Sequence, residues 1–213
     1  MTVNTRPENS ARHYHSPKRR QQAGATRRRI LAAAERLFAS RGYAVVTMDD
    51  IAREGKVSLA TVYLHFPGRS AVIGALAEEI TAAPELSVEQ VFRESDPIEQ
   101  VQIGARILRQ LNERAWLIAD ILRSHRGTDP ELERLWALWQ QRHLHANRQA
   151  VAAIAGRGAL RPGLSVDEAA DVLYAIAGTE VYRALTQERG WTPARYQHWL
   201  FETACRELLA SPR

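Results

Sequence analysis

The sequence predicts an all-α protein, and three observations support this fold class. Apolar residues recur at helical spacing in one segment after another, beginning at about Arg27. Beyond Pro84 no stretch has the alternating pattern of a strand. The segment from Thr47 to Phe66 contains two short helical patterns joined by a tight, glycine-containing turn. Such a pair is typical of a helix-turn-helix motif.

The composition suits a regulatory unit of two subdomains. The chain has 213 residues, and 45% of them are apolar, which is enough to bury a sizeable core. No apolar run approaches the roughly 18 residues of a membrane span, and the N-terminus has no apolar signal region. We therefore expect a cytoplasmic protein with no membrane partner. The single cysteine, Cys205, excludes an internal disulfide framework.

Positive charge is concentrated at the N-terminal end. Residues 1–69 contain 13 Lys and Arg against 5 Asp and Glu, whereas residues 70–213 contain 16 against 19. A uniformly basic protein would not show this difference. The asymmetry is what a surface for nucleic-acid phosphates would produce, so it favours an N-terminal region that binds DNA.

Residues 1–24 are polar, contain two prolines and show no apolar periodicity. They are expected to form a disordered basic arm. Two interpretations of this arm remain open. It can be a solvated tail, or it can add phosphate or minor-groove contacts beside the main DNA site.

Three helices are expected to form the next domain, residues 25–70. The first, from about residue 27 to 40, has a single apolar stripe. Thr47 is suited to cap the second helix and pairs with Asp50 as a capping box. Ser58 is suited to cap the third helix, which glycine and proline stop soon after Phe66.

The third helix is too polar for a core helix and fits a recognition helix. In a helix-turn-helix, the first residues of the recognition helix contact base edges in the major groove. Leu59 and Ala60 can pack against a thymine methyl group, while Ser58 and Thr61 can bond bases or phosphates.

Residues 27–76 resemble the N-terminal domain of the TetR family of bacterial transcription regulators. About fifty consecutive residues carry the resemblance, including the helix-turn-helix at about 46–65 and its Thr61 to Phe66 run. Residues 188–200 show a weaker resemblance to the junction before the last helix of family members. The resemblance implies a bacterial, nucleoid-associated regulator, most often a repressor. Such a protein binds a palindromic double-stranded operator as a homodimer and is released by a small-molecule effector.

The chain departs from the family pattern at two places. Lys56 stands where the family has glycine, so either Gly55 makes the turn or Lys56 adopts a left-handed conformation. Gly68, Arg69 and Ser70 replace the usual Ser-Lys-Glu sequence that begins the fourth helix. Arg69 is therefore a candidate to take over the phosphate contact of that lysine.

The resemblance also implies phosphate contacts for Thr47, Tyr63 and His65, and Lys56 is well placed for another. For Tyr63 and His65 the alternative is a packed aromatic pair at a helix end. The full set of predicted DNA-binding residues is Arg28, Thr47, Lys56, Ser58, Leu59, Ala60, Thr61, Tyr63, His65 and Arg69.

Residues 71–213 are expected to form a helical ligand-binding and dimerisation domain, a role that the resemblance implies. Apolar periodicity predicts a linking helix at about 69–83, which joins this domain to the DNA-binding domain. The further expected helices lie near 86–94, from Asp96-Pro97, around Trp116, from Pro130 to about Gly156, at about 166–188 and at about 193–210.

In the family, the tryptophan-bearing middle helices enclose an effector pocket, which needs mostly apolar lining and a few polar groups. The predicted pocket residues are Asn112, Trp116, Asp120, Trp136, Trp139, His143 and Tyr174. For each of the polar ones, a surface position or a satisfied core contact is the alternative. His143 and His145 lie roughly 200° apart around a helix, so we expect no metal site there.

The last two helices are expected to pair with their copies as the four-helix dimer interface of the family. The helix at 166–188 is apolar on nearly all sides, and a core helix in a monomer is the alternative. Gly178 would permit a close helix crossing. The predicted interface residues are Ile176, Gly178, Tyr182, Tyr196, Trp199, Leu200 and Thr203.

No catalytic motif emerges from the sequence. A Gly-rich phosphate loop, a nucleophile elbow and a Cys/His cluster are all missing. We therefore expect no enzyme activity and no cofactor. Two rival functions remain open: an activator or ligand-dependent DNA binder of the same fold, and a helical small-molecule-binding or catalytic protein that keeps its N-terminal domain only as a scaffold.

Overall fold

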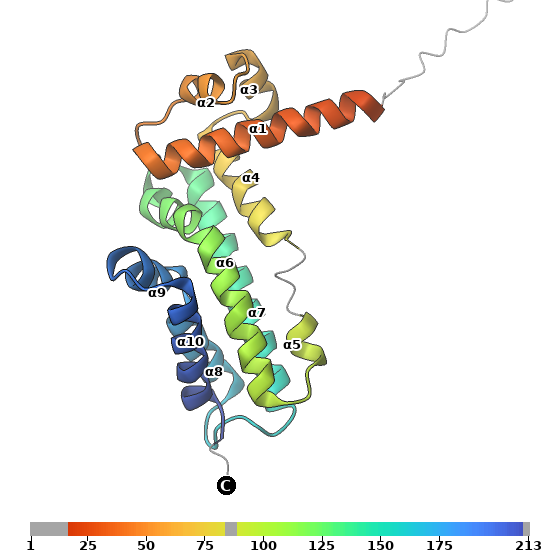
Figure 1. Cartoon of the computed structure of the whole chain (residues 1–213), viewed down its shortest axis with the longest axis vertical. Helices are drawn as coiled ribbons and strands as arrows, with labels where there is room; N and C mark the ends of the chain where they lie inside the picture. Colours follow the sequence, from red (N-terminus) through yellow and green to blue (C-terminus); the bar gives the residue numbers. More distant parts are fainter. Residues whose placement is uncertain (1–16, 84–88, 211–213) are drawn as a thin grey trace, which may run out of the picture.

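The computed structural model describes residues 17–83 and 89–210, and it confirms the predicted all-α fold. A small domain, which contains the long helix α1 and two short helices, sits at one end of an elongated helical body (Figure 1). Within the described residues no strand forms, apart from an isolated antiparallel bridge between Leu160 and Leu209. No helix in these ranges is long and apolar enough to cross a membrane.

The small domain contains α1 (Pro17–Arg41), α2 (Met48–Glu54) and α3 (Leu59–His65), followed by α4 (Arg69–Thr81). The prediction that α1 begins near residue 27 was wrong, because the helix starts ten residues earlier. Residues 17–24, assigned to the arm from sequence, are thus helical, and the first turns of α1 extend past the other small helices (Figure 1). The rest of the predicted arm, residues 1–16, lies outside the described residues.

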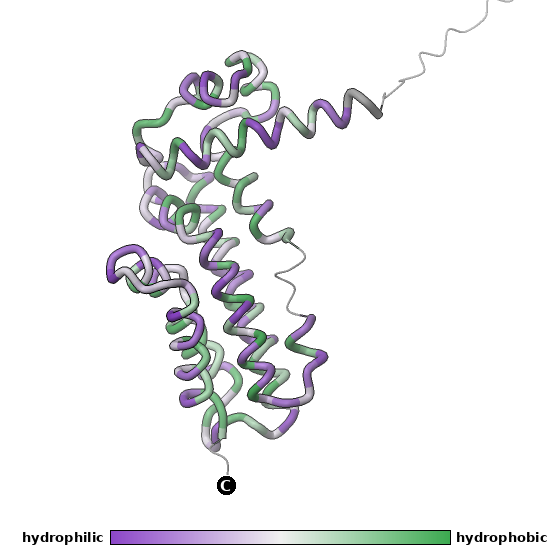
Figure 2. Tube along the Cα trace, viewed as in Figure 1, coloured by the Kyte–Doolittle hydropathy of each residue, from purple (hydrophilic) through white to green (hydrophobic). Residues whose placement is uncertain are grey.

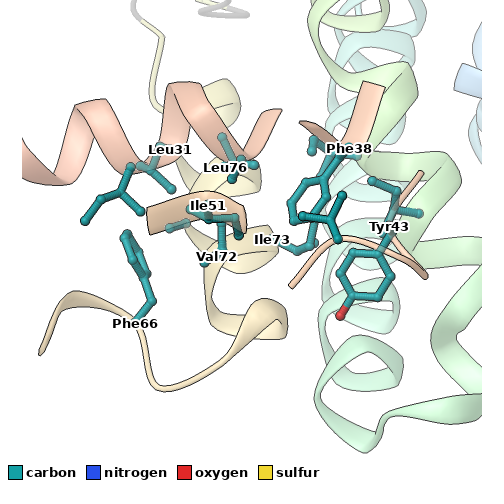
Figure 3. Packing of buried hydrophobic residues seen from close by; sticks show 14 of the residues in the cluster. Leu31, Phe38, Tyr43, Ile51, Phe66, Val72, Ile73 and Leu76 are labelled. Carbon is teal, nitrogen blue, oxygen red and sulfur yellow. The ribbon is translucent and has the colours of Figure 1, made fainter. Parts of the chain in front are cut away.

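The core of the small domain lies between α1, α2 and α4. Phe38 of α1 and Ile51 of α2 pack with Ile73 of α4, and each is no more than 1% exposed (Figure 3). Burying side chains of this size stabilises a domain by about 1.5–3 kcal/mol each. The linking helix α4 is therefore part of the core of the small domain as well as its connection to the body.

The body consists of α5 (Glu89–Arg93), α6 (Pro97–His125), α7 (Pro130–Ala155), α8 (Val166–Ala177), α9 (Thr179–Arg183) and α10 (Pro193–Leu208). A 3-10 turn, Arg126–Thr128, joins α6 to α7, and a π-helical turn, Ala184–Glu188, follows α9. Both α6 and α7 begin with an aspartate cap followed by proline, which is a favourable helix start. Apolar and polar residues alternate along these helices, as amphipathic packing requires (Figure 2).

Two helix boundaries differ from the sequence prediction. A second helix was expected around Trp116, but α6 continues without a break for 29 residues. Conversely, the helix expected at 166–188 is interrupted at Gly178, whose backbone is extended (ψ 153°). A Cβ at Gly178 would lie 3.2 Å from Glu180 Oε2 and 3.4 Å from the Tyr174 carbonyl. The glycine therefore allows a local break in the helix, and within the described part of the protomer no helix other than α8 and α9 comes within 4 Å of the position of its Cβ. A close crossing with a partner's helix stays a prediction.

Candidate nucleic-acid interface and ligand cavity

The start of α2 is fixed by a complete capping box. Thr47 Oγ1 accepts a hydrogen bond from the Asp50 backbone N–H at 3.1 Å, and the Thr47 backbone N–H donates to Asp50 Oδ2 at 3.0 Å. Hydrogen bonds from the Thr47 backbone and side chain, and then Arg41, hold the pKa of Asp50 well below its usual range. The Thr47 hydroxyl also lies 2.8 Å from Asp50 Oδ2, so its only proton is donated there. Its predicted phosphate contact would require that proton to change partner.

The sequence left two geometries open for the turn between α2 and α3. In the structure Lys56, and not Gly55, has the left-handed conformation. Lys56 has a left-handed backbone (φ 52°), whereas Gly55 stays right-handed (φ −75°). Gly55 is needed for another reason, since a Cβ there would lie 3.0 Å from the Ile51 carbonyl and 3.6 Å from Ala33 Cβ. Arg29 Nη2 donates to the Lys56 carbonyl at 3.1 Å, and the Lys56 side chain remains exposed.

The recognition helix α3 presents small side chains to solvent. Ser58 caps it by accepting from the Thr61 N–H at 3.1 Å, and the two hydroxyl oxygens lie 2.7 Å apart. Leu59 and Ala60 are exposed, and Tyr63 is 51% exposed. Leu64, which was not predicted as a contact, is 83% exposed. Its helical spacing from Ala60 puts both residues on one face, which the sequence could have revealed.

Arg69 has a structural role that the sequence did not reveal, and its phosphate contact stays a prediction. Its Nη1 donates to the carbonyls of Tyr43, Ala44 and Val46 at 2.8, 3.2 and 2.9 Å. The guanidinium also lies over the Tyr43 ring, 4.8 Å from its centre. Nη1 has two hydrogens, so two of the three carbonyls share one of them, and Arg69 thereby fixes the segment that leads into α2.

The remaining predicted contacts differ in exposure. Arg28 is exposed on α1. His65 is half-buried, and its ring centre is 6.3 Å from that of Phe66. Phe66 is in turn covered by Arg27, whose guanidinium carbon lies 5.4 Å from the ring centre. These observations leave His65 at the edge of the surface around α3, and its phosphate contact stays a prediction.

A cavity of about 330 Å³ lies between α4, α6 and α7 in the body. Parts of α5, α8 and α10 also line it, and most of the lining is apolar. Of the seven predicted pocket residues, Trp139 and His143 line this cavity. Trp136 and Tyr174 instead line a separate void of about 10 Å³, which Trp139 and His143 also reach.

The other three predicted pocket residues are placed elsewhere. Asn112 is fully buried, and its amide nitrogen donates to the Ala177 carbonyl at 2.9 Å and to the Tyr196 hydroxyl at 3.0 Å. Trp116 packs against the core between α6, α8 and α10, and Asp120 pairs with Arg123 at 2.9 Å. These predictions failed because periodicity does not tell which face of a buried helix meets the cavity.

Sequence reasoning missed two amides that do line the cavity, Gln100 and Asn147. They are 0% and 3% exposed. Gln100 lies at helical spacing from Ile107 and Leu111, which also line the cavity. A polar residue within an apolar stripe was the available signal. Burial lowers the pKa of His143, against the opposing effect of Glu180, so this imidazole is neutral near pH 7.

Several predicted interface residues lie inside the protomer. Tyr182, Tyr196, Leu200 and Thr203 are at most 7% exposed and pack within the body, so they have almost no surface to offer a partner. Ile176, Gly178 and Trp199 are half-exposed. The dimer interface stays a prediction, and among the predicted residues these three can reach a partner.

No three His, Cys, Asp or Glu side chains cluster as metal ligands within residues 17–83 and 89–210.

Comparison with known proteins agrees with the geometry of the small domain. Residues 30–76 match the family model described as "Bacterial regulatory proteins, tetR family". The chain is 22% identical over 167 residues to the HTH-type transcriptional regulator EthR of Mycobacterium tuberculosis, an alignment that covers 77% of each chain.

Two solved structures share the fold. A transcriptional regulator from Saccharomonospora viridis in complex with choline aligns with a TM-score of 0.71 at 24% identity, covering 88% of this chain and 100% of that one. The SmeT–triclosan complex aligns with a TM-score of 0.72 at 20% identity, covering 88% and 93%. SmeT is the repressor of a multidrug efflux pump of Stenotrophomonas maltophilia.

Proposed function

Through residues 30–76 this chain belongs to the tetR family of bacterial regulatory proteins, and from that premise we propose how it works as a DNA-binding transcription regulator. Two copies form a dimer whose recognition helices bind a palindromic operator. A small molecule in the body cavity releases the DNA, so the protein acts as a repressor. The effector binds to the body, and DNA binds to the small domain.

The observation that carries this proposal is the double role of α4. Val72, Ile73 and Leu76 of this helix lie in the core of the small domain. Gly74 and Ala77, on another face of the same helix, line the cavity. A helix of 13 residues is a stiff connection. A ligand that needs more room beside α4 must therefore also move the core on which α3 is mounted.

The energetics follow from linkage. An effector shifts the equilibrium only by its difference in affinity for the DNA-binding and released arrangements. The coupling is typically 1–3 kcal/mol, and DNA must weaken the effector by the same factor. Half-sites one helical turn apart, roughly 34–36 Å, or a multiple of that spacing would make DNA binding sensitive to small movements of α3.

The names of the relatives support the same reading. EthR is a transcriptional regulator, and SmeT is a repressor that was solved with triclosan. The regulator from Saccharomonospora viridis holds choline. By analogy, we propose that the cavity of this chain takes a small molecule of its own.

A cavity-filling substitution tests the proposal without a known effector. Gly104 of α6 lines the cavity, and a Cβ added there meets no atom within 4 Å. Gly104→Leu should place its side chain in the cavity and lower DNA affinity by roughly 5- to 150-fold. Fluorescence anisotropy measures this affinity, with DNA duplexes taken from the region beside the gene that encodes the protein.

The matched control is Gln102→Leu, an exposed position on the same helix, which should leave DNA affinity unchanged. Equal DNA affinity for both variants would contradict coupling through the cavity. A higher affinity of Gly104→Leu would indicate a regulator that needs its ligand to bind DNA.

A further inference from the structure

The cavity contains buried polar atoms that no protein group satisfies. Gln100 Oε1, Asn147 Nδ2 and His143 Nε2 are each buried without a hydrogen-bond partner, and all three residues line the cavity. A buried polar group without a partner costs about 1–3 kcal/mol. Gln100 and Asn147 line this cavity and not the separate void, whereas His143 lines both, so the two amides are the groups that indicate an occupant able to supply hydrogen bonds.

The orientation of Gln100 is fixed by its other contact. Gln100 Nε2 donates to the Val91 carbonyl at 2.8 Å. Because a carbonyl oxygen can only accept, the amide nitrogen must face Val91, and the atom without a partner is the acceptor Oε1. A ligand must therefore bring an N–H or O–H donor to this point.

Asn147 offers the complementary group from the facing helix. Its Nδ2 is buried without a partner, so in this orientation it needs an acceptor such as a carbonyl oxygen. No other hydrogen bond from the described residues fixes the Asn147 amide, so rotation of the side chain would instead present Oδ1 to an N–H donor, and an amide ligand can serve either orientation. Gln100 lies in the first turn of α6 and Asn147 in the second half of α7. Since α6 and α7 run in opposite directions, both amides lie in the half of the cavity away from the small domain (Figure 1).

The interior of the cavity is uncharged. Four of the described residues that line the cavity have ionisable side chains: Glu78, Arg134, Arg142 and His143. Glu78, Arg134 and Arg142 are exposed at the edge of the cavity. His143 is held neutral by burial. Burying an ionic ligand group among neutral amides and apolar side chains costs far more than burying a neutral one.

From these contacts we propose that the effector is an electrically neutral, mainly apolar molecule with an N–H or O–H donor for Gln100 and a carbonyl-type acceptor for Asn147. Primary and secondary amides are the simplest class with both groups. This inference rests on the proposed function only in taking the cavity as the effector site. The ligand class itself can be tested without DNA.

Isothermal titration calorimetry of the full chain with four probes tests the ligand class. Octanamide is neutral and carries both groups, whereas octanoate is an anion and octyltrimethylammonium a cation. N,N-dimethyloctanamide is neutral but lacks the N–H donor. Octanamide should bind at least tenfold more tightly than each of the other three, because each loses a hydrogen bond or buries a charge.

Two variants locate the contacts. Asn147→Leu should weaken octanamide roughly tenfold. Gln100→Leu should weaken octanamide but leave the dimethyl analogue unchanged, which is the signature of a direct contact in a double-mutant cycle. Gln102→Leu, exposed on the same helix as Gln100, is the control and should bind every probe like the wild type.

Tighter binding of octanoate or of the ammonium probe would overturn the proposal, as would equal binding of the two amides, which would mean that water satisfies Gln100. Failure of all four probes to bind at millimolar concentration would overturn it as well. The comparison of probes uses the unmodified protein, so it stands even where a variant fails to fold. If octanamide binds as expected but does not release DNA, then the proposed function fails and the ligand class holds.

Discussion

Lys56 has an unfavourable backbone conformation, and its positive charge is exposed at the edge of the surface around α3. A side chain in the left-handed conformation costs roughly 1–2 kcal/mol, which glycine avoids. The sequence allowed two geometries for this turn, and the structure has the left-handed backbone at Lys56 while Gly55 stays right-handed. A phosphate contact of the exposed Lys56 side chain would offset part of the cost of this conformation.

Lys56→Gly should therefore separate stability from DNA binding. The free energy of unfolding should rise by about 1 kcal/mol because the strain is relieved. At the same time, the dependence of log K on log salt should become shallower by about one unit, since one phosphate contact is lost. Urea denaturation and salt-dependent anisotropy measure the two effects. An unchanged salt slope would show that Lys56 does not touch phosphate.

Asp50 makes the stability of the small domain depend on pH in acid. Its folded pKa lies well below the unfolded value of about 3.9, so its contribution is complete above that value and is lost as the pH falls through the folded pKa. Between pH 7 and pH 3 the wild type should lose more stability than Asp50→Asn, as measured by urea midpoints. An equal loss of stability in both proteins would mean that the pKa of the Asp50 carboxyl is not lowered by folding.

At the scale of helices, sequence reasoning succeeded where local signals are strong. Thr47 and Ser58 cap helices as predicted, because a capping side chain acts within one turn of its own position. It failed where packing decides the outcome. No local signal reveals that α6 continues past Asn112, or that the helix expected beyond Gly178 breaks there.

The candidate site shows the same limit. The recognition helix was placed correctly, since its polarity and caps are local properties. The structural role of Arg69 was missed because its three carbonyl partners lie 23 to 26 residues earlier in the chain. Trp116 and Asp120 were misjudged because one sequence does not tell which face of α6 meets the cavity.

Asn112 connects three helices, since from α6 it donates to the end of α8 and to Tyr196 of α10. Asn112→Leu should lower the free energy of unfolding by about 1–3 kcal/mol, because the Ala177 carbonyl would be left buried without its donor. Urea denaturation measures this loss, with Gln102→Leu as the exposed control on the same helix. Because Asn112 does not line the cavity, ligand affinity should be unaffected. A large loss of octanamide binding in a folded variant would place Asn112 at the ligand after all.

For the whole molecule, the proposed dimer uses the outer face of α8 and α10. Ala175 is exposed on α8 beside Ile176, so a substitution there does not disturb the protomer core. Ala175→Glu should weaken dimerisation by roughly 100-fold or more, because a charge would be buried without a partner. Leu144→Glu is the matched control, since Leu144 is an exposed apolar residue on α7, outside the helices proposed to pair.

Sedimentation velocity over a range of concentrations measures the dissociation constant of the dimer. If Ala175→Glu and Leu144→Glu both remain dimeric like the wild type, then α8 is not at the interface. Weakening of the dimer by Leu144→Glu alone would place the interface on α7 instead.

In the proposed complex, two copies of α3 contact one DNA duplex together. Selection of bound duplexes from a random pool by the purified full chain tests whether they do. We expect enrichment of an inverted repeat with half-site centres about 34–36 Å apart, or a multiple of that distance. Recovery of no common sequence, or of a single unrepeated site, would contradict it.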